Sequence, residues 1–293
     1  MQSPIEPLFN AIAASPYRVA PETSLELGSL IVEKSIRLEF CSDKQMRAEL
    51  QLSRNIVCLG VPFLEVLWAA AYAYIVVYNE CQLANKSGAT FFSIADTPRT
   101  AAAYQLYRDL LQAHAAGSPI AWPLSARQPE RYPQEGTDGY IANELFLVAV
   151  SWIIHHEIAH ARLEHQAITV SSINEENDAD RTATRSVCGT TEESQPLQKR
   201  AMGIVAALLL LIAYDLEVPR AQSSTHPPPF ERLILNLDAT NLGENEMVYG
   251  FAFKLVEIHL LQSRVPYEIN RTGTFREMFV SACLALRKGA TGG

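Results

Sequence analysis

The spacing of apolar residues along the chain predicts a mostly helical protein. Seven segments either have helical length or repeat apolar residues at steps of three and four, as one face of a helix does. These segments span residues 62–82, 101–116, 141–165, 175–187, 197–216, 246–262 and 274–286. Ahead of them, residues 24–40 are rich in β-branched side chains that partly alternate, which predicts two short strands or a hairpin. The predicted fold class is therefore mainly α (α+β), with a small β element near the N-terminus.

The same pattern predicts how the chain is divided. Residues 1–60 are expected to form an N-terminal α/β segment that packs on a helical domain of residues 61–290. The segment that follows Gly117 contains four prolines and two glycines. Proline and glycine disfavour helices and strands, so residues 117–139 are expected to form a surface loop or a lid.

Charge and cysteine content narrow the possible partners. With 24 Lys and Arg against 32 Asp and Glu, the formal net charge is −8, and no basic run could follow a phosphate backbone. Nucleic acid is therefore not expected as a partner. The five cysteines are widely spaced, odd in number and never arranged as CxxC, which argues against a disulfide framework and a cysteine-built zinc site. A reducing cytoplasm is the expected location.

The apolar stretch at residues 57–78 is the nearest approach to a membrane span. Gly60, Pro62 and Glu65 interrupt it, and a glutamate would be costly at the middle of a bilayer. The alternative is a buried helix that begins near Pro62, because proline suits the first turn of a helix. No stable membrane insertion is expected. The N-terminal residues MQSPIEPLFN also lack the basic and apolar runs of a secretion signal.

The sequence His156-Glu157-Ile158-Ala159-His160 is an HExxH motif. On a helix, residues four apart lie one turn apart on the same face, so both imidazoles can reach one metal ion. Glu157 then lies beside the ion, where it can act as the general base that activates a bound water. The motif predicts a Zn²⁺ site with His156 and His160 as ligands.

The surrounding residues indicate that both histidines point inward. A stripe with steps of three and four is apolar except for the two histidines: Leu145, Ala149, Trp152, His156, His160 and Leu163. A single histidine on such a stripe is usually a hydrogen-bonded core residue. Two histidines beside a glutamate favour a metal site instead, because a divalent ion supplies the positive charge that a buried Glu157 needs.

A catalytic zinc ion normally has three protein ligands and a water, so one more ligand is expected. Leu163 and Gln166 exclude the continuation HExxHxxGxxH. Glu176 and Asp180 are four apart on the next predicted helix, which suggests Glu176 as the third ligand and Asp180 as the carboxylate that holds a ligand imidazole. The alternative is a solvated acidic first turn of that helix. Rival ligands are Glu164, His165, Glu175 and Asp178.

HHEIAH and EENDAD together resemble the HExxH and ExxAD motifs of gluzincin metallopeptidases, notably the group of CAAX-processing and HtpX-type proteases. Thr225-His226-Pro227 followed by Arg232 is similar to the HPxxxxR segment of such families. The resemblance implies a zincin-like helical metallopeptidase domain with one Zn²⁺. His226 would then help stabilise the oxyanion, or else only cap a turn. Arg232 would pair with a buried carboxylate rather than bind substrate.

Motif order, chain length and the helix at residues 63–68 are similar to those of the Lit-type phage-exclusion peptidases. This resemblance implies a bacterial cytoplasmic protease that cleaves elongation factor Tu when a phage component activates it. Two alternatives stay open: a regulatory or quality-control metallopeptidase that cleaves a repressor or misfolded protein, and a non-catalytic protein-binding module with a structural zinc. Glu157 argues against the last one, because a structural site needs no base.

Overall fold

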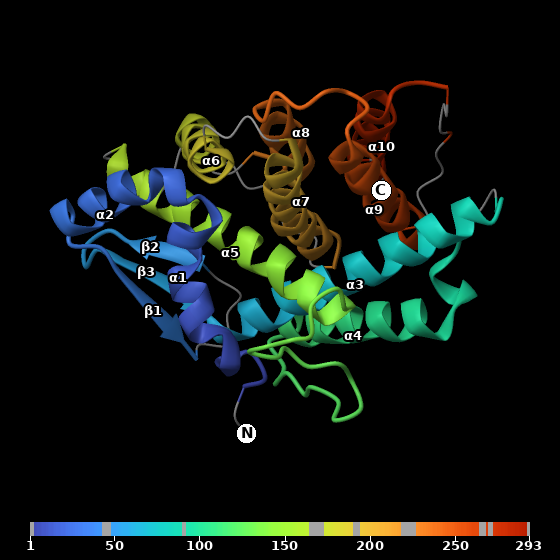
Figure 1. The fold of residues 1–293 in the computed structure, drawn as a ribbon, viewed down its shortest axis with the longest axis horizontal. Coiled ribbons are helices and arrows are strands. Elements are labelled where there is room, and N and C mark those ends of the chain that lie inside the picture. Colours follow the sequence, from blue (N-terminus) through green and yellow to red (C-terminus); the bar gives the residue numbers. More distant parts are fainter. Residues whose placement is uncertain are drawn as a thin grey trace.

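The computed structural model describes residues 3–42, 48–89, 92–163, 173–189, 194–217, 227–263, 268 and 272–291. The helices are α1 (Phe9–Val19), α2 (Ser24–Glu33), α3 (Val61–Lys86), α4 (Pro98–Ala115), α5 (Asp138–Arg162), α6 (Ile173–Cys188), α7 (Ser194–Glu217), α8 (Pro229–Asp238), α9 (Met247–Gln262) and α10 (Phe275–Thr291). The strands are β1 (Arg37–Cys41), β2 (Ala48–Gln51) and β3 (Ile56–Gly60). The fold is mainly α with a small sheet near the N-terminus, as the sequence predicted (Figure 1).

Helix α5 lies at the centre of the fold. It packs against α1, α3, α6 and α7, and also contacts β2 and β3 (Figure 1). Thr137 begins the helix, because its side chain accepts a hydrogen bond from the backbone N–H of Tyr140. Apolar side chains then follow on nearly every side, as expected of a helix that is buried all round. The HExxH motif lies in the last two turns of this central helix.

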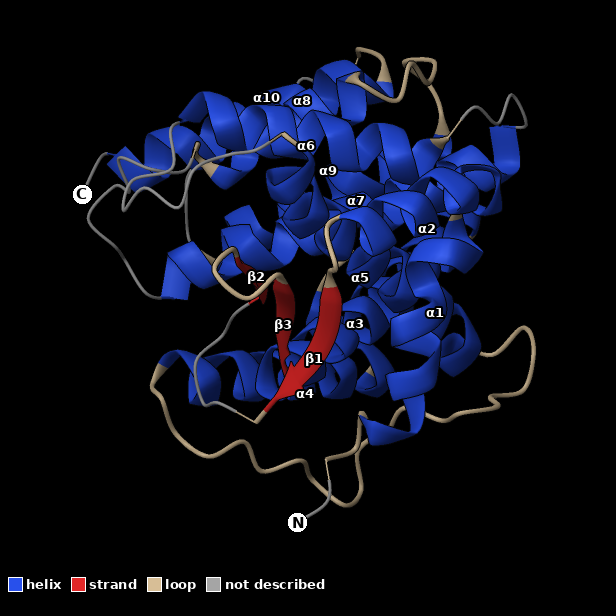
Figure 2. Ribbon diagram, turned by 90° about the vertical axis from the view of Figure 1, so that its left-hand side faces the viewer, coloured by secondary structure: helices blue, strands red, loops and turns tan. Residues whose placement is uncertain are grey.

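The three strands form a sheet in the order β1-β3-β2 (Figure 2). β3 is buried and central; it pairs in parallel with β1 and antiparallel with β2, where Leu50 is opposite Val57. β2 is therefore an edge strand of this sheet. Its contacts with α5 place one edge of the sheet beside the HExxH helix.

Each of the seven predicted helices is present, but the prediction for residues 24–40 is partly wrong. Residues 24–33 form α2, and only residues 37–41 form a strand. Leu27 and Leu30 pack toward the core three residues apart, so burial of one helical face overrides the β-branched run at its end. The pattern also did not predict α1, which contains Pro16.

The expectation against disulfides is corrected at one pair of cysteines. Cys41 and Cys58, 17 positions apart in sequence, form a disulfide with their Cα atoms 6.3 Å apart. Cys41 ends β1 and Cys58 lies in β3, so pairing of the two strands brings the thiols together. Cys81, Cys188 and Cys283 are buried and are not disulfide-bonded in the part of the chain that the structure describes. The cytoplasmic location stays a prediction.

Residues 116–137 connect α4 to α5 without a helix or strand. The Nδ2 of Asn143 donates to the carbonyl of Glu130 in this loop at 2.8 Å, near the start of α5. Asn143 is 13 residues before His156, which is about 20 Å along a helix. The lid function stays a prediction, and the loop packs at the opposite end of α5 from the HExxH motif.

Two of the described helices, α3 and α5, are long and apolar enough to cross a membrane. Most of the apolar window of each is buried inside the protein, and core helices meet the same criteria. Glu65 in α3 is also buried, and the Ser3 hydroxyl donates to its carboxylate at 2.5 Å. Length and composition therefore do not establish membrane insertion.

Two buried histidines make the stability of the fold dependent on pH. Burial lowers the pKa of His155 to about 4, against the opposing effect of a hydrogen bond with the backbone of Pro16. Burial also lowers the pKa of His259 to about 4, where its Nε2 lies 3.3 Å from the hydroxyl of Tyr74. Both rings are therefore neutral in the folded protein at neutral pH.

We expect His259 to lower the free energy of unfolding as the pH drops from 7 to 5. The unfolded chain gains a proton at His259 near pH 6.5, whereas the folded chain does so only near pH 4, so acid favours unfolding. This one residue should contribute about 2 kcal/mol to the loss at pH 5. Urea unfolding at both pH values measures it, and His259→Gln should reduce the loss by that amount. An equal loss of unfolding free energy in the wild type and in His259→Gln would contradict the lowered pKa of His259.

Candidate metal centre

The two histidines of the HExxH motif face each other one turn apart on α5. The Nε2 atoms of His156 and His160 are 3.2 Å apart, and the ring centroids are 4.9 Å apart. Trp152, one turn earlier, lies beside His156 with a centroid separation of 5.7 Å. The predicted inward stripe is buried through His156, but Leu163 at its end is 40% exposed. The motif thus lies where the central helix emerges from the core.

Glu176 on α6 completes a cluster with these histidines. Its Oε2 lies 3.5 Å from the Nε2 of His156, and its Oε1 lies 3.6 Å from the Nε2 of His160. Side-chain atoms of the three residues lie within 4.8 Å of one another. Glu176 is buried, whereas Glu175 is only partly buried and Asp178 is exposed. The rival candidates Glu164 and His165 lie outside the described residues.

The donor set and its spacing fit a zinc ion. Two imidazole nitrogens and one carboxylate oxygen are the protein ligands of many catalytic zinc sites. Ligands at about 2.1 Å from a tetrahedral ion are separated by about 3.4 Å, which follows from zinc–ligand distances. The two imidazole nitrogens are 3.2 Å apart, close to this value, and each has one Glu176 oxygen at a similar distance: Oε2 at 3.5 Å from His156 and Oε1 at 3.6 Å from His160. The residues therefore suit the metal that the sequence predicts.

Asp180, one turn after Glu176, binds His156 from the other side. Its Oδ1 lies 2.8 Å from the Nδ1 of His156. Arg232 on α8 donates to both oxygens of the same carboxylate, at 2.7 and 2.8 Å. Burial would raise the pKa of Asp180, but the Arg232 guanidinium outweighs it and holds the pKa well below its usual range. Arg232 is thus the partner of a buried carboxylate, as the sequence analysis favoured.

The cluster favours a positive charge at the centre. Burial lowers the pKa of His156, but the carboxylates of Asp180 and Glu176 outweigh this effect and raise the pKa to about 9. Either a proton or a metal cation satisfies that preference, and the two compete for the same nitrogen. We conclude that the arrangement of charges is compatible with a divalent ion.

Glu157 lies beside the cluster and contacts the sheet. Its Oε2 accepts a hydrogen bond of 2.7 Å from the backbone N–H of Leu50 in β2. Burial raises the pKa of Glu157 to about 7, although His156 and the Leu50 amide act in the opposite direction. A carboxyl group with such a pKa can both accept and release a proton near neutral pH. Sequence reasoning missed Leu50, because nothing in the sequence links it to a residue 107 positions away.

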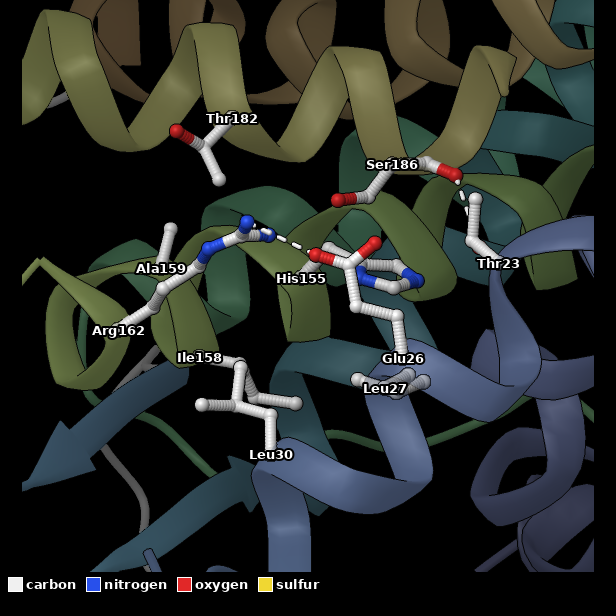
Figure 3. Close-up of a pocket in the computed structure, with 10 residues that line it drawn as sticks. All are labelled: Thr23, Glu26, Leu27, Leu30, His155, Ile158, Ala159, Arg162, Thr182 and Ser186. Carbon is white, nitrogen blue, oxygen red and sulfur yellow. Dashed lines mark hydrogen bonds and ion pairs between the residues drawn. The ribbon is translucent and has the colours of Figure 1, made fainter. Parts of the chain in front are cut away.

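His226 lies outside the described residues, so its role stays a prediction. A small pocket lies elsewhere, where α2, α5 and α6 meet (Figure 3). His155 and Arg162 line it from α5, and Arg162 pairs with Glu26 of α2 at 2.8 Å. Its volume of about 20 Å³ is enough for about one water molecule. This pocket is therefore too small for a peptide substrate.

His156, His160 and Glu176 thus form a largely buried cluster that could hold a metal ion, with Glu157 beside it. The Peptidase U49 family model matches residues 57–252, and the chain belongs to this family. The chain is 32% identical over 254 residues to the "Cell death peptidase" of Escherichia coli (strain K12), covering 85% of this chain and 86% of that protein. No solved structure matches. The protein is thus a peptidase that resembles the Lit-type enzymes, as the sequence predicted.

Replacing Arg232 by methionine should strongly destabilise the protein. The variant leaves the buried carboxylate of Asp180 without its guanidinium partner, which should cost about 3–5 kcal/mol of unfolding free energy. The double variant Arg232→Met with Asp180→Asn should recover part of the loss, because no unpaired charge remains. Urea unfolding of the three proteins measures both effects. Arg232→Met as stable as the wild type would contradict the proposed stabilisation of Asp180 by Arg232.

Proposed function

We propose that this peptidase is a zinc-dependent endopeptidase that hydrolyses peptide bonds in a protein substrate. The observation that carries the proposal is the convergence of His156, His160 and Glu176, whose side-chain atoms lie within 4.8 Å of one another beside Glu157. Family membership supports the peptidase activity. The donor set and its spacing support zinc as the metal.

Each residue of the site has a role in this proposal. His156, His160 and Glu176 hold one Zn²⁺, which when bound supplies a Lewis acid and lowers the pKa of a coordinated water. Glu157 is the general base: it takes a proton from the attacking water and returns it to the leaving nitrogen. The Leu50 N–H holds one of its oxygens at 2.7 Å, which limits the movement of the carboxylate. His226 is proposed to stabilise the developing oxyanion.

We further propose that the protein acts in phage exclusion in the bacterial cytoplasm. The name of the relative, "Cell death peptidase", supports a protease directed at the cell's own proteins. The resemblance to Lit-type peptidases suggests elongation factor Tu as the substrate and a phage-derived activator as the trigger. A regulatory or quality-control metallopeptidase would share the same site and differ in its substrate.

The proposal is distinct from a binding module with a structural zinc. Structural zinc sites usually have four protein ligands and need no base. Glu157 has a pKa raised to about 7 next to the cluster, which suits proton transfer better than structure. Substitution of Glu157 therefore distinguishes a zinc peptidase from a binding module with a structural zinc.

Glu157→Gln should retain the metal and the fold but lose peptidase activity. The amide keeps the size of the side chain but cannot accept the proton, so the cleavage rate should fall by about 10²–10⁴-fold. Zinc content by elemental analysis and cleavage of a protein substrate measure the two properties. His156→Ala is the matched control, and it should lose the metal together with the activity.

Cleavage by Glu157→Gln at the wild-type rate would overturn the role of the base. Wild-type protein that binds no zinc after purification and reconstitution would overturn the metal site. Loss of zinc in Glu157→Gln would instead indicate that this carboxylate is itself a ligand.

The substrate can be identified by comparing cells that express the wild type or Glu157→Gln. Cleavage creates new protein N-termini, so termini found only with the wild type should belong to substrates. We expect elongation factor Tu among them after phage challenge. An intact elongation factor Tu, with new termini in a repressor or in misfolded proteins, would favour the alternative functions.

A further inference from the structure

Behind the metal cluster, three helices each present a pair of side chains one turn apart. The pairs are Trp152 and His156 on α5, Asp180 and Thr184 on α6, and Arg232 and Asn236 on α8. Residues four apart share one face of a helix, so each pair lies on one face. The three faces meet in a single region, because hydrogen bonds join their side chains. His156, Asp180 and Arg232 belong to the sequence motifs, and Trp152 belongs to the apolar stripe of α5. Thr184 and Asn236 belong to no motif.

The remaining members of these pairs link back to Asp180 by hydrogen bonds. The Trp152 Nε1–H donates to the Thr184 hydroxyl at 3.0 Å. That hydroxyl donates to the Asn236 Oδ1 at 2.5 Å, and the Asn236 Nδ2 donates to the Asp180 Oδ2 at 3.1 Å. The Asp180 Oδ1 also lies 2.8 Å from the Nδ1 of His156. His156 and Trp152 are on the same helix, α5, so this contact closes the path into a circuit.

The chemistry of the groups fixes the direction of every link. An indole N–H only donates, so the Thr184 oxygen accepts from Trp152. The ionised Asp180 carboxylate and the Arg232 carbonyl only accept, so the Asn236 NH₂ group faces both of them, at 3.1 and 2.8 Å. The Asn236 Oδ1 then faces Thr184 and accepts its hydroxyl proton. A reversed amide would place two acceptors or two donors against each other. The amide of Asn236 therefore has one orientation.

The circuit determines which nitrogen of His156 faces the metal. Asp180 is ionised and accepts from Arg232 and Asn236, and its Oδ1 lies 2.8 Å from the His156 Nδ1, so the imidazole carries its proton on that nitrogen. The Nε2 then keeps its lone pair on the side of Glu176 and His160. We infer that Thr184 and Asn236 are positioning residues of the metal site, which fix the Asp180 carboxylate and through it the orientation of the His156 ligand.

The side chains of the circuit are buried, which supports this inference. Trp152, Thr184 and Asn236 are 1%, 0% and 2% exposed, so no solvent competes for their hydrogen bonds. Apolar side chains in place of the whole circuit could fill such a core at little cost in stability, whereas replacing one member leaves its partners unsatisfied. A merely structural role for the circuit would affect folding but not the affinity for a metal. The inference rests on the proposed function, since it needs the metal to bind at His156.

The test compares zinc affinity in Thr184 variants of the full chain. Thr184→Val has nearly the same shape but no hydroxyl, so the Asn236 amide loses its fixed orientation. We expect zinc affinity to fall about 10- to 100-fold, as is usual when groups behind the ligands are removed. Thr184→Ser keeps the hydroxyl and should bind zinc within about twofold of the wild type. Competition with a chromophoric zinc chelator measures these affinities.

Asn143 offers a matched control for Asn236. It is also a buried asparagine, it accepts from the indole of Trp68 at 2.7 Å, and it lies on α5 about 20 Å from His156. Asn236→Leu and Asn143→Leu should both lower the melting temperature. Only Asn236→Leu should weaken zinc binding, and only it should change the visible spectrum of the Co²⁺-substituted protein.

Thr184→Val with wild-type zinc affinity and an unchanged Co²⁺ spectrum would overturn the inference. Equal weakening of zinc binding in Asn236→Leu and Asn143→Leu would also overturn it, because the effect would then follow from stability alone. If Asn236→Leu does not fold, the Thr184 pair decides the question. Wild-type protein that binds neither Zn²⁺ nor Co²⁺ would refute the proposed function, and the inference would fall with it.

Discussion

The buried carboxylate of Asp180 is the group on which the site depends. It accepts two hydrogen bonds from Arg232 and one from Asn236, and it holds the Nδ1 of His156. A charge buried in this way is unfavourable unless nearly every lone pair has a donor. The helices α5, α6 and α8 must therefore keep one spacing and one rotation relative to one another. That constraint also fixes the relative positions of His156 and His160 on α5 and Glu176 on α6.

The same constraint explains why the chemistry lies on the central helix. Most of α5 is buried in contact with four other helices, so its backbone is rigid up to the turn that carries the motif. On that turn, Glu157 meets the edge of the sheet, where the Leu50 amide holds it. The fold thus combines a rigid support for His156 and His160 with a carboxylate of raised pKa. Such a combination suits proton transfer beside a metal ion.

The sequence was a good guide to the helices, because α3, α5 and α7 are long and mostly apolar, and α6 and α10 carry a regular apolar face. It failed at residues 24–40, where a short helix ends in β-branched residues and tertiary burial decides between helix and strand. It also failed for Cys41 and Cys58, whose contact depends on the pairing of β1 with β3. Both errors concern short segments whose structure is set by distant neighbours.

By itself, the sequence determined the spacing of His156 and His160 and of Glu176 and Asp180, because helix geometry places residues four apart on one face. It could not determine that Glu157 meets Leu50, or that Asp180 meets Asn236, since those pairs are 107 and 56 positions apart. Only the tertiary structure decided these contacts. They depend on the packing of α8 on α6 and of β2 on α5, which no local periodicity encodes.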